Sequence, residues 1–277
     1  MLEIILIIVV CFLILTFFYK QAVCEFRINQ MEWNQKDKTA TMPLQTLSIN
    51  GQDPIREILH EKVPLVIRGI PKASFWTHDD VANRSCFSEI PVFQDMSLTE
   101  WLKDAKSATA VTLCPWKYPQ AEAIAKESGI AIWAKKYINP VIIHPLLRLW
   151  LTPSYHCWAG TVGLRKTFAT WTCLFPVDGA LSVTIMPESV ESSLPVHWRN
   201  CIVKDLTAKD TPFLSDLKYM DVILRPGTCL FMPAHWYVSW TSHESSTIIP
   251  MACTISYHTP ISSLAFSGGA SSPTPPM

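Results

Sequence analysis

A histidine and an aspartate separated by one residue can hold a metal ion together, and this spacing occurs at Thr77-His78-Asp79-Asp80. Acidic residues also favour the first turn of a helix, because they face the positive end of the helix dipole. We interpret this segment as a helix start and not as a ligand pair. The remaining histidines show no paired spacing that would indicate a metal site.

The cysteines do not form a metal-binding pattern either. Nine of them are spread along the chain without a Cys-x-x-Cys pair, so the spacing typical of zinc sites is missing. We expect reduced thiols that are buried as small apolar side chains. The glycine-rich signatures of nucleotide sites and the Gly-x-Ser-x-Gly signature of serine hydrolases are missing as well.

Composition excludes a polyanion as the expected partner. Lys plus Arg and Asp plus Glu both number 23, and only 17% of the residues are charged. No global field therefore favours nucleic acid. A hydrophobic content of 49% over 277 residues is enough for a large buried core.

The first twenty residues predict a membrane anchor. Residues 4–19 carry no charge, and with the flanking apolar residues a helix here would reach roughly 27–30 Å, the core of a thin bilayer. A cleaved signal peptide is the alternative. Lys20 and Arg27 follow the span, whereas only Glu3 precedes it. The positive-inside rule then places the C-terminal domain of a single-pass protein on the cytosolic side.

We divide the chain into an anchor (1–20), a membrane-proximal linker (21–50), one domain (51–260) and a flexible tail (261–277). The domain is predicted to begin with a helix at 53–60, strands at 62–70 and 109–113, a helix at 97–105 with a Ser-x-x-Glu capping box, and a helical stretch at 121–137 interrupted near Gly129.

Beyond Trp150 the pattern changes to short apolar runs bounded by Pro, Gly or Asp. Closely spaced runs of this kind are typical of a β-sandwich or barrel, so the fold class is mainly β with an α component. The expected strands are 171–177, 180–186, 200–205, 221–225, 228–232, 236–241 and 247–257.

Several motifs, in this order, resemble the JmjC/cupin-like family of iron- and 2-oxoglutarate-dependent oxygenases. Pro64–Gly69 resembles the strand by which the chain enters the family's domain. Cys157–Gly160 and Phe175–Gly179 resemble the first half of its double-stranded β-helix, and Arg225–Trp240 resembles its late strand pair. The resemblance implies a cupin-like jelly roll with flanking helices over about residues 55 to 257.

The resemblance also implies that the family's ligands are missing. Its His-x-Asp pair falls at Lys166 and Phe168, its distal histidine at Val238, and the lysine that pairs with 2-oxoglutarate at Leu181. Phenylalanine and valine offer no donor atom to a metal, and a charged lysine repels it. We therefore expect no metal, no cofactor and no catalysis. An active oxygenase with ligands elsewhere in the chain is the alternative.

A domain without this chemistry would act by binding. Trp236, Tyr237 and Trp240 are candidates for an aromatic contact patch, because aromatic residues are enriched at interface hot spots. An apolar pocket for a small molecule, lined by Trp171, Leu181 and Phe231, is a further hypothesis.

The anchor and the missing ligands together resemble degenerate JmjC/cupin-like proteins of large nucleocytoplasmic DNA viruses. That resemblance implies an interaction or structural role in a virion. The expected partners are a membrane and capsid or other virion proteins.

Overall fold

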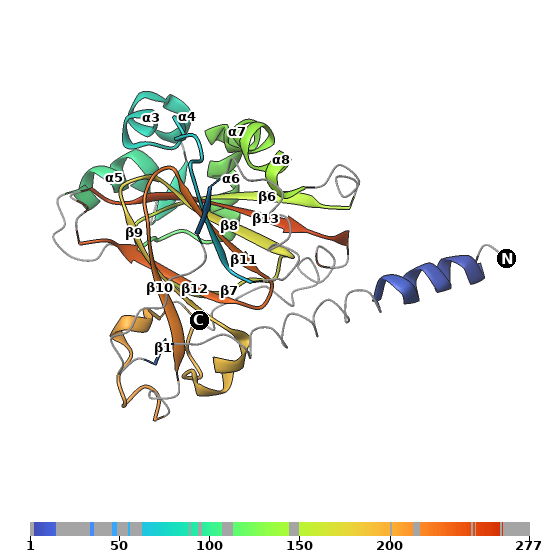
Figure 1. Cartoon of the computed structure of the whole chain (residues 1–277). Coiled ribbons are helices and arrows are strands. Elements are labelled where there is room, and N and C mark those ends of the chain that lie inside the picture. The colour runs from blue at the N-terminus through green and yellow to red at the C-terminus, as the bar shows by residue number, and fades with distance from the viewer. Residues whose placement is uncertain are drawn as a thin grey trace.

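Two large sheets of mostly antiparallel strands and a group of helices dominate the described part of this mainly β, α+β protein (Figure 1). The short apolar runs of the sequence predict this class. The computed structural model describes residues 3–14, 34–35, 46–48, 55, 63–88, 90–93, 96–106, 113–143, 150–199, 201–212, 217–244, 246, 248–260 and 262.

The larger sheet has six strands, which in spatial order are β2 (Thr46–Ser48), β3 (Leu65–Arg68), β11 (Thr228–Pro233), β8 (Trp171–Asp178), β13 (Met251–His258) and β6 (Thr152–Ala159). Its longest ladders flank β13, where Cys253 pairs with Cys157 on one side and with Phe175 on the other. β2 adds to the edge as a parallel partner of β3.

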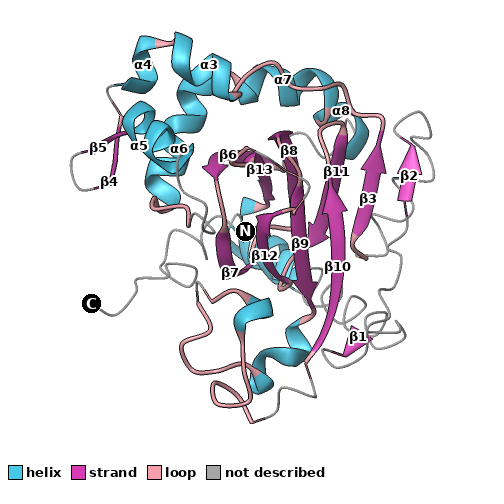
Figure 2. Ribbon diagram, turned by 90° about the vertical axis from the view of Figure 1, so that its left-hand side faces the viewer, coloured by secondary structure: helices cyan, strands magenta, loops and turns pink. Residues whose placement is uncertain are grey.

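The smaller sheet has five strands, which in spatial order are β1 (Asn34–Gln35), β10 (Lys218–Leu224), β9 (Leu181–Met186), β12 (Tyr237–Ser242) and β7 (Val162–Lys166). All its neighbouring pairs are antiparallel. Figure 2 shows the two sheets packed face to face, and side chains of both contribute to one hydrophobic core.

A second, smaller core covers the other face of the smaller sheet. Tyr237, Leu164 and Met186 lie there against Val190 and Leu206, which belong to the connection between β9 and β10. This connection contains two 3₁₀ helices, η2 (Glu188–Ser193) and η3 (Val203–Asp205). Both faces of β12 are consequently buried. The strand expected at 200–205 is wrong, because 3₁₀ helix η3 forms there.

The helices between β3 and β6 lie over the β6 and β13 side of the larger sheet (Figure 1). Two tryptophans join them to β6. The indole N–H groups of Trp76 and Trp116 donate to the backbone carbonyls of Trp158 and Cys157. The helices are α3 (His78–Asn83), α4 (Ser85–Ser88), α5 (Leu98–Lys106), α6 (Tyr118–Ser128), α7 (Ile130–Tyr137) and α8 (Asn139–Ile142). Two short strands, β4 (Pro91–Phe93) and β5 (Met96–Ser97), pair just before α5.

Local signals account for the helix boundaries. At α5 the Ser97 hydroxyl accepts the N–H of Glu100, and the Glu100 carboxylate accepts the N–H of Ser97, so the predicted capping box is confirmed. Between α6 and α7, Gly129 has φ +88°, a left-handed conformation that favours glycine and ends helices. The interruption predicted near Gly129 is confirmed.

All the other strand predictions beyond Trp150 are confirmed within a few residues, and β3 matches the strand expected at 62–70. The sequence pattern did not single out β6 and β7. Most of the helix expected at 53–60 and of the strand expected at 109–113 lies outside the described residues. Leu113, at the end of the latter, forms an isolated bridge with Thr161.

Residues 3–14 form a helix whose apolar side chains, from Ile4 to Phe12, are largely exposed. Within the described residues, no helix has both the length and the apolar character that crossing a membrane requires. The end of the anchor expected at 1–20 lies outside the described residues. So does most of the linker expected at 21–50 and of the tail expected at 261–277.

Candidate functional site

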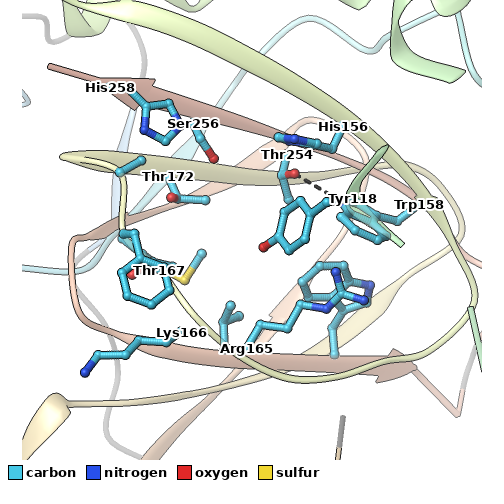
Figure 3. Close-up of a pocket in the computed structure, with 15 residues that line it drawn as sticks. Tyr118, His156, Trp158, Arg165, Lys166, Thr167, Thr172, Thr254, Ser256 and His258 are labelled. Atoms are coloured by element: carbon cyan, nitrogen blue, oxygen red, sulfur yellow. Dashed lines mark hydrogen bonds between the residues drawn. The ribbon is translucent and has the colours of Figure 1, made fainter. Parts of the chain in front are cut away.

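A pocket lies between the two sheets, with one wall from each sheet and Tyr118 of α6 at its side (Figure 3). Its volume is about 40 Å³, counted as space open to the centres of water molecules. One water needs about 10–15 Å³ on this scale, so the pocket has room for a small molecule. The residues that line it are Tyr118, His156, Trp158, Arg165, Lys166, Thr167, Phe168, Ala169, Thr172, Met232, Val238, Trp240, Thr254, Ser256 and His258.

An irregular pairing between β7 and β12 decides which cation enters this pocket. Trp240 pairs with Val162, and Val238, two residues before Trp240, pairs with Arg165. Two steps along β12 thus match three steps along β7, which is the extra residue of a β-bulge. Val162, Val238 and Trp240 belong to the core between the sheets. The bulge therefore turns Arg165 toward that core and Lys166 toward the opposite face.

Arg165 lies over aromatic rings in the pocket (Figure 3). Its guanidinium carbon is 4.3 Å from the ring centroid of Trp158 and 5.0 Å from that of Tyr118. Within the described part of the chain, the guanidinium forms no hydrogen bond or ion pair, and its Nε atom is buried without a partner. This permanent cation is thus held by cation–π contact, and no acceptor from the described residues takes up its N–H groups.

The wall from the larger sheet is polar but uncharged. Thr172 of β8 pairs with Ser256 of β13, so both side chains lie on one face of that sheet. The Thr254 hydroxyl accepts the indole N–H of Trp158 at 3.0 Å. Burial, together with the nearby His258 and Arg165, lowers the pKa of His156 to about 3. His156 is therefore a neutral imidazole at physiological pH.

Lys166 directs its ammonium group away from the pocket. Its Nζ donates to Glu188 at 2.7 Å and to Glu191 at 2.8 Å, and it lies 5.4 Å from the ring centroid of Tyr237. The nearby imidazole of His235, 3.4 Å away, and the hydrogen bond from Lys166 lower the pKa of Glu188 to about 2. The charge of Lys166 is therefore neutralised on the outer face of the smaller sheet.

The structure brings most of the predicted site positions together. Lys166, Phe168 and Val238 all border the pocket, although Lys166 does so without its charged group. Leu181 is fully buried in the core and is not among the described pocket residues. The small-molecule pocket expected around Trp171, Leu181 and Phe231 is likewise not the one observed, since none of these residues borders it.

The expected aromatic patch is not at the surface. Trp236 and Tyr237 are fully buried and Trp240 is 3% exposed. Tyr237 belongs to the second, smaller core, whereas Trp236 and Trp240 belong to the core between the sheets. Since both faces of β12 are covered, these aromatic residues contribute to packing and, in the case of Trp240, to the pocket wall.

The His-x-Asp segment caps a helix, as the sequence predicts. The Thr77 hydroxyl accepts the N–H of Asp80. The Asp80 carboxylate accepts the N–H of Trp76 at 2.8 Å and pairs with Arg84 at 2.9 Å. His78 Nε2 lies 2.8 Å from the carbonyl oxygen of Ile249. Among the residues that the structure describes, no three His, Cys, Asp or Glu side chains converge as a metal site would require.

The important residue that sequence reasoning missed is Arg165. Counting alternate residues from the apolar Val162 assigns Lys166, not Arg165, to the inner face. The isolated glycine in this strand, Gly163, was the available signal, because glycine inside a strand often marks a bulge.

Comparisons with known proteins add no relative to this description. No protein-family model matches the chain, and no curated protein matches it.

Proposed function

We propose that this protein is a membrane-attached, non-catalytic binding module with a double-stranded β-helix fold of the cupin/JmjC type. The order of its strands supports the fold. The eight consecutive strands β6 to β13 form the orders β6–β13–β8–β11 and β7–β12–β9–β10 within the two sheets. This is the order expected when eight strands fold as two Greek keys into a jelly roll.

One observation carries the non-catalytic part of the proposal: Arg165 occupies the inward position opposite Val238. In the family that the sequence resembles, these two strands supply the metal ligands. Here they offer a cation and an apolar side chain to the pocket, and Phe168, just after β7, adds its ring. A guanidinium has no lone pair for a metal and repels a dication, so this arrangement opposes metal binding electrostatically.

Metal content and turnover test the non-catalytic part. The full chain, purified in detergent without chelators, is expected to contain far less than one iron or zinc per chain after dialysis. It is also expected to release no CO₂ from 2-oxoglutarate when iron is added. Stoichiometric metal that survives dialysis, or iron-dependent CO₂ release, would overturn the proposal in favour of the oxygenase alternative.

The helix over residues 3–14 supports membrane attachment. A helix that is apolar on all sides is normally buried in protein or lipid, yet Ile7 is 60% exposed and Val10 46% exposed. The full chain is expected to float with liposomes in a density gradient. Changing Ile7 and Val10 together to Lys should abolish flotation, because each Lys costs about 2.5–3.5 kcal/mol at the centre of a membrane helix.

A matched control uses two exposed apolar residues of the folded domain. Ile132 of α7 is 79% exposed and Ile223 of β10 is 52% exposed. Changing both to Lys adds the same charge and should leave flotation intact. Equal loss of flotation in the two double variants would contradict a membrane role for residues 3–14.

We further propose that the attached membrane belongs to a virion, and that the domain contacts capsid or other virion proteins. The resemblance to proteins of large DNA viruses supports this setting. Chemical cross-linking of purified particles, followed by mass spectrometry, should link surface lysines of the domain to capsid proteins. Cross-links confined to membrane proteins of the host cell would contradict it.

A further inference from the structure

Arg165 is a charged group whose surroundings do not neutralise it. Its guanidinium lies against Trp158 and Tyr118, and in the described part of the chain no carboxylate pairs with it. Removing a charge from water without an ion pair or hydrogen bonds is costly. Aromatic faces offset part of that cost and leave the N–H groups available. The position is therefore suited to receive an anion from outside the chain.

The described residues of the pocket supply positive charge without negative charge. No Asp or Glu is among them, and Lys166 directs its charge toward Glu188 and Glu191. A guanidinium edge matches the two oxygens of a carboxylate in a bidentate arrangement. The chemistry of the site thus selects a planar anion that accepts hydrogen bonds.

The other walls of the pocket indicate what the uncharged part of the ligand is. Met232 and Val238 give the pocket an apolar side, and Thr172 and Thr254 give it a side with hydroxyl groups. The volume of about 40 Å³ is a few times the 10–15 Å³ needed for one water. A short aliphatic body fits such a pocket better than a fully polar inorganic anion.

We infer that the pocket between the sheets binds a small organic carboxylate, with its carboxylate paired to Arg165 and its aliphatic part against Met232 and Val238. The inference rests on the proposed function, since it assumes a binding module, and it names the class of ligand. The site differs from the cosubstrate position that the family resemblance implies. That position is Leu181 on β9, a residue that does not border the pocket.

Propionate, succinate and inorganic phosphate are the probes for the test. Calorimetric titration of the metal-free full chain in detergent is expected to detect one site for propionate or succinate and a weaker interaction with phosphate. In Arg165→Gln the carboxylate affinity should fall by about tenfold or more, the size of a lost charge-assisted hydrogen bond. Arg165→Lys, which keeps the charge but loses the bidentate edge, should bind with intermediate affinity.

Lys218→Gln is the control. It removes one positive charge from β10 of the same sheet, at an exposed residue that does not border the pocket, so carboxylate affinity should not change. Val238→Met provides a second test, since it fills the apolar side without changing any charge and should weaken binding.

Three results would overturn the inference: no carboxylate binding by the wild-type chain, phosphate binding at least as tight as carboxylate binding, or equal losses in Arg165→Gln and Lys218→Gln. These results are distinct from those that test the proposed function. A chain without metal and without turnover that also fails to bind carboxylates would refute only the inference. Iron-dependent turnover would refute the proposed function whatever the pocket binds.

Discussion

Arg165 and Lys166 are consecutive cations on β7, yet their surroundings are opposite. Lys166 meets two carboxylates on the outer face of the smaller sheet. Arg165 meets two aromatic rings on the inner face, without an ion pair in the described part of the chain. The first charge is satisfied within the fold and contributes to its stability. The guanidinium of Arg165 is held in place by the rings but has no paired carboxylate among the described residues, as a binding site for an anion requires.

The largest difference between the two faces is expected from one tryptophan on each face. Trp158, on the inner side, is 1% exposed, and its ring is 4.3 Å from the Arg165 guanidinium. Trp158→Ala should lower the free energy of unfolding by about 3–5 kcal/mol, since it opens a cavity in the core. Trp198, on the outer side, is only partly buried and packs on Tyr237. Trp198→Ala should cost less than half as much.

Urea denaturation of the full chain in detergent measures both values. Similar costs for the two variants would show that the inner face has no special dependence on Trp158.

The two cores also explain how far the sequence could predict the fold. Strands β8 to β11 stand out because they are short apolar runs between Gly, Pro and Asp residues, and such signals are local. The aromatic residues of β12 gave a misleading signal. A strand buried on both faces has no alternation of polar and apolar residues, so Trp236 and Tyr237 could not be distinguished from a surface patch.

Two of the positions that the resemblance marks, Phe168 and Val238, border the pocket. The side chain that determines its chemistry depends on a bulge in the pairing of β7 with β12. These strands are far apart in the sequence, and a shift by one residue reverses which side chains point inward. The local signal, Gly163, indicates that a bulge can form but does not determine the register.

The two faces of the smaller sheet are expected to lose their contributions to stability in different pH ranges. Burial lowers the pKa of His156 to about 3, whereas the pKa of a histidine in the unfolded chain is about 6.5. Between these two pH values, His156 is protonated in the unfolded chain and neutral in the folded protein. Stability should therefore be intact above pH 6.5 and fall as the pH decreases. One such proton amounts to about 2–3 kcal/mol between pH 6.5 and 4.5. On the outer face Glu188, whose pKa is lowered to about 2, loses its contribution only below about pH 4.5.

His156→Phe tests this separation. Denaturation at several pH values should show a shallower slope between pH 6.5 and 4.5 in the variant, with the slope below pH 4.5 retained. Some slope should remain above pH 4.5, because burial also lowers the pKa of His258. An unchanged slope in His156→Phe would assign the acid sensitivity to other groups.

Removing the two cations should change stability in opposite directions. Arg165→Met replaces a partly buried charge, which no carboxylate of the described residues pairs with, by an apolar chain of similar length. It is expected to stabilise the ligand-free protein by about 1 kcal/mol. Lys166→Met leaves Glu188 and Glu191 without their shared partner and should destabilise it by about 1 kcal/mol. Thermal unfolding of the two variants without added carboxylate measures the difference. Destabilisation by Arg165→Met equal to that by Lys166→Met would remove the contrast between the faces.

The smallest effect is expected from salt acting on the outer face. Glu191 has a side chain that is 48% exposed, so its bond to Lys166 is accessible to ions. Glu191→Gln should cost at most about 0.5 kcal/mol at low salt, as for other surface ion pairs, and less in 1 M NaCl because the screening length then falls to about 3 Å. Over the same range of salt, the stability change in Arg165→Met should stay constant, since rings and not ions surround that cation. Urea denaturation at the two salt concentrations measures the stability changes of both variants. A salt-dependent effect of Arg165→Met would mean that the guanidinium is open to solvent ions rather than enclosed by the pocket.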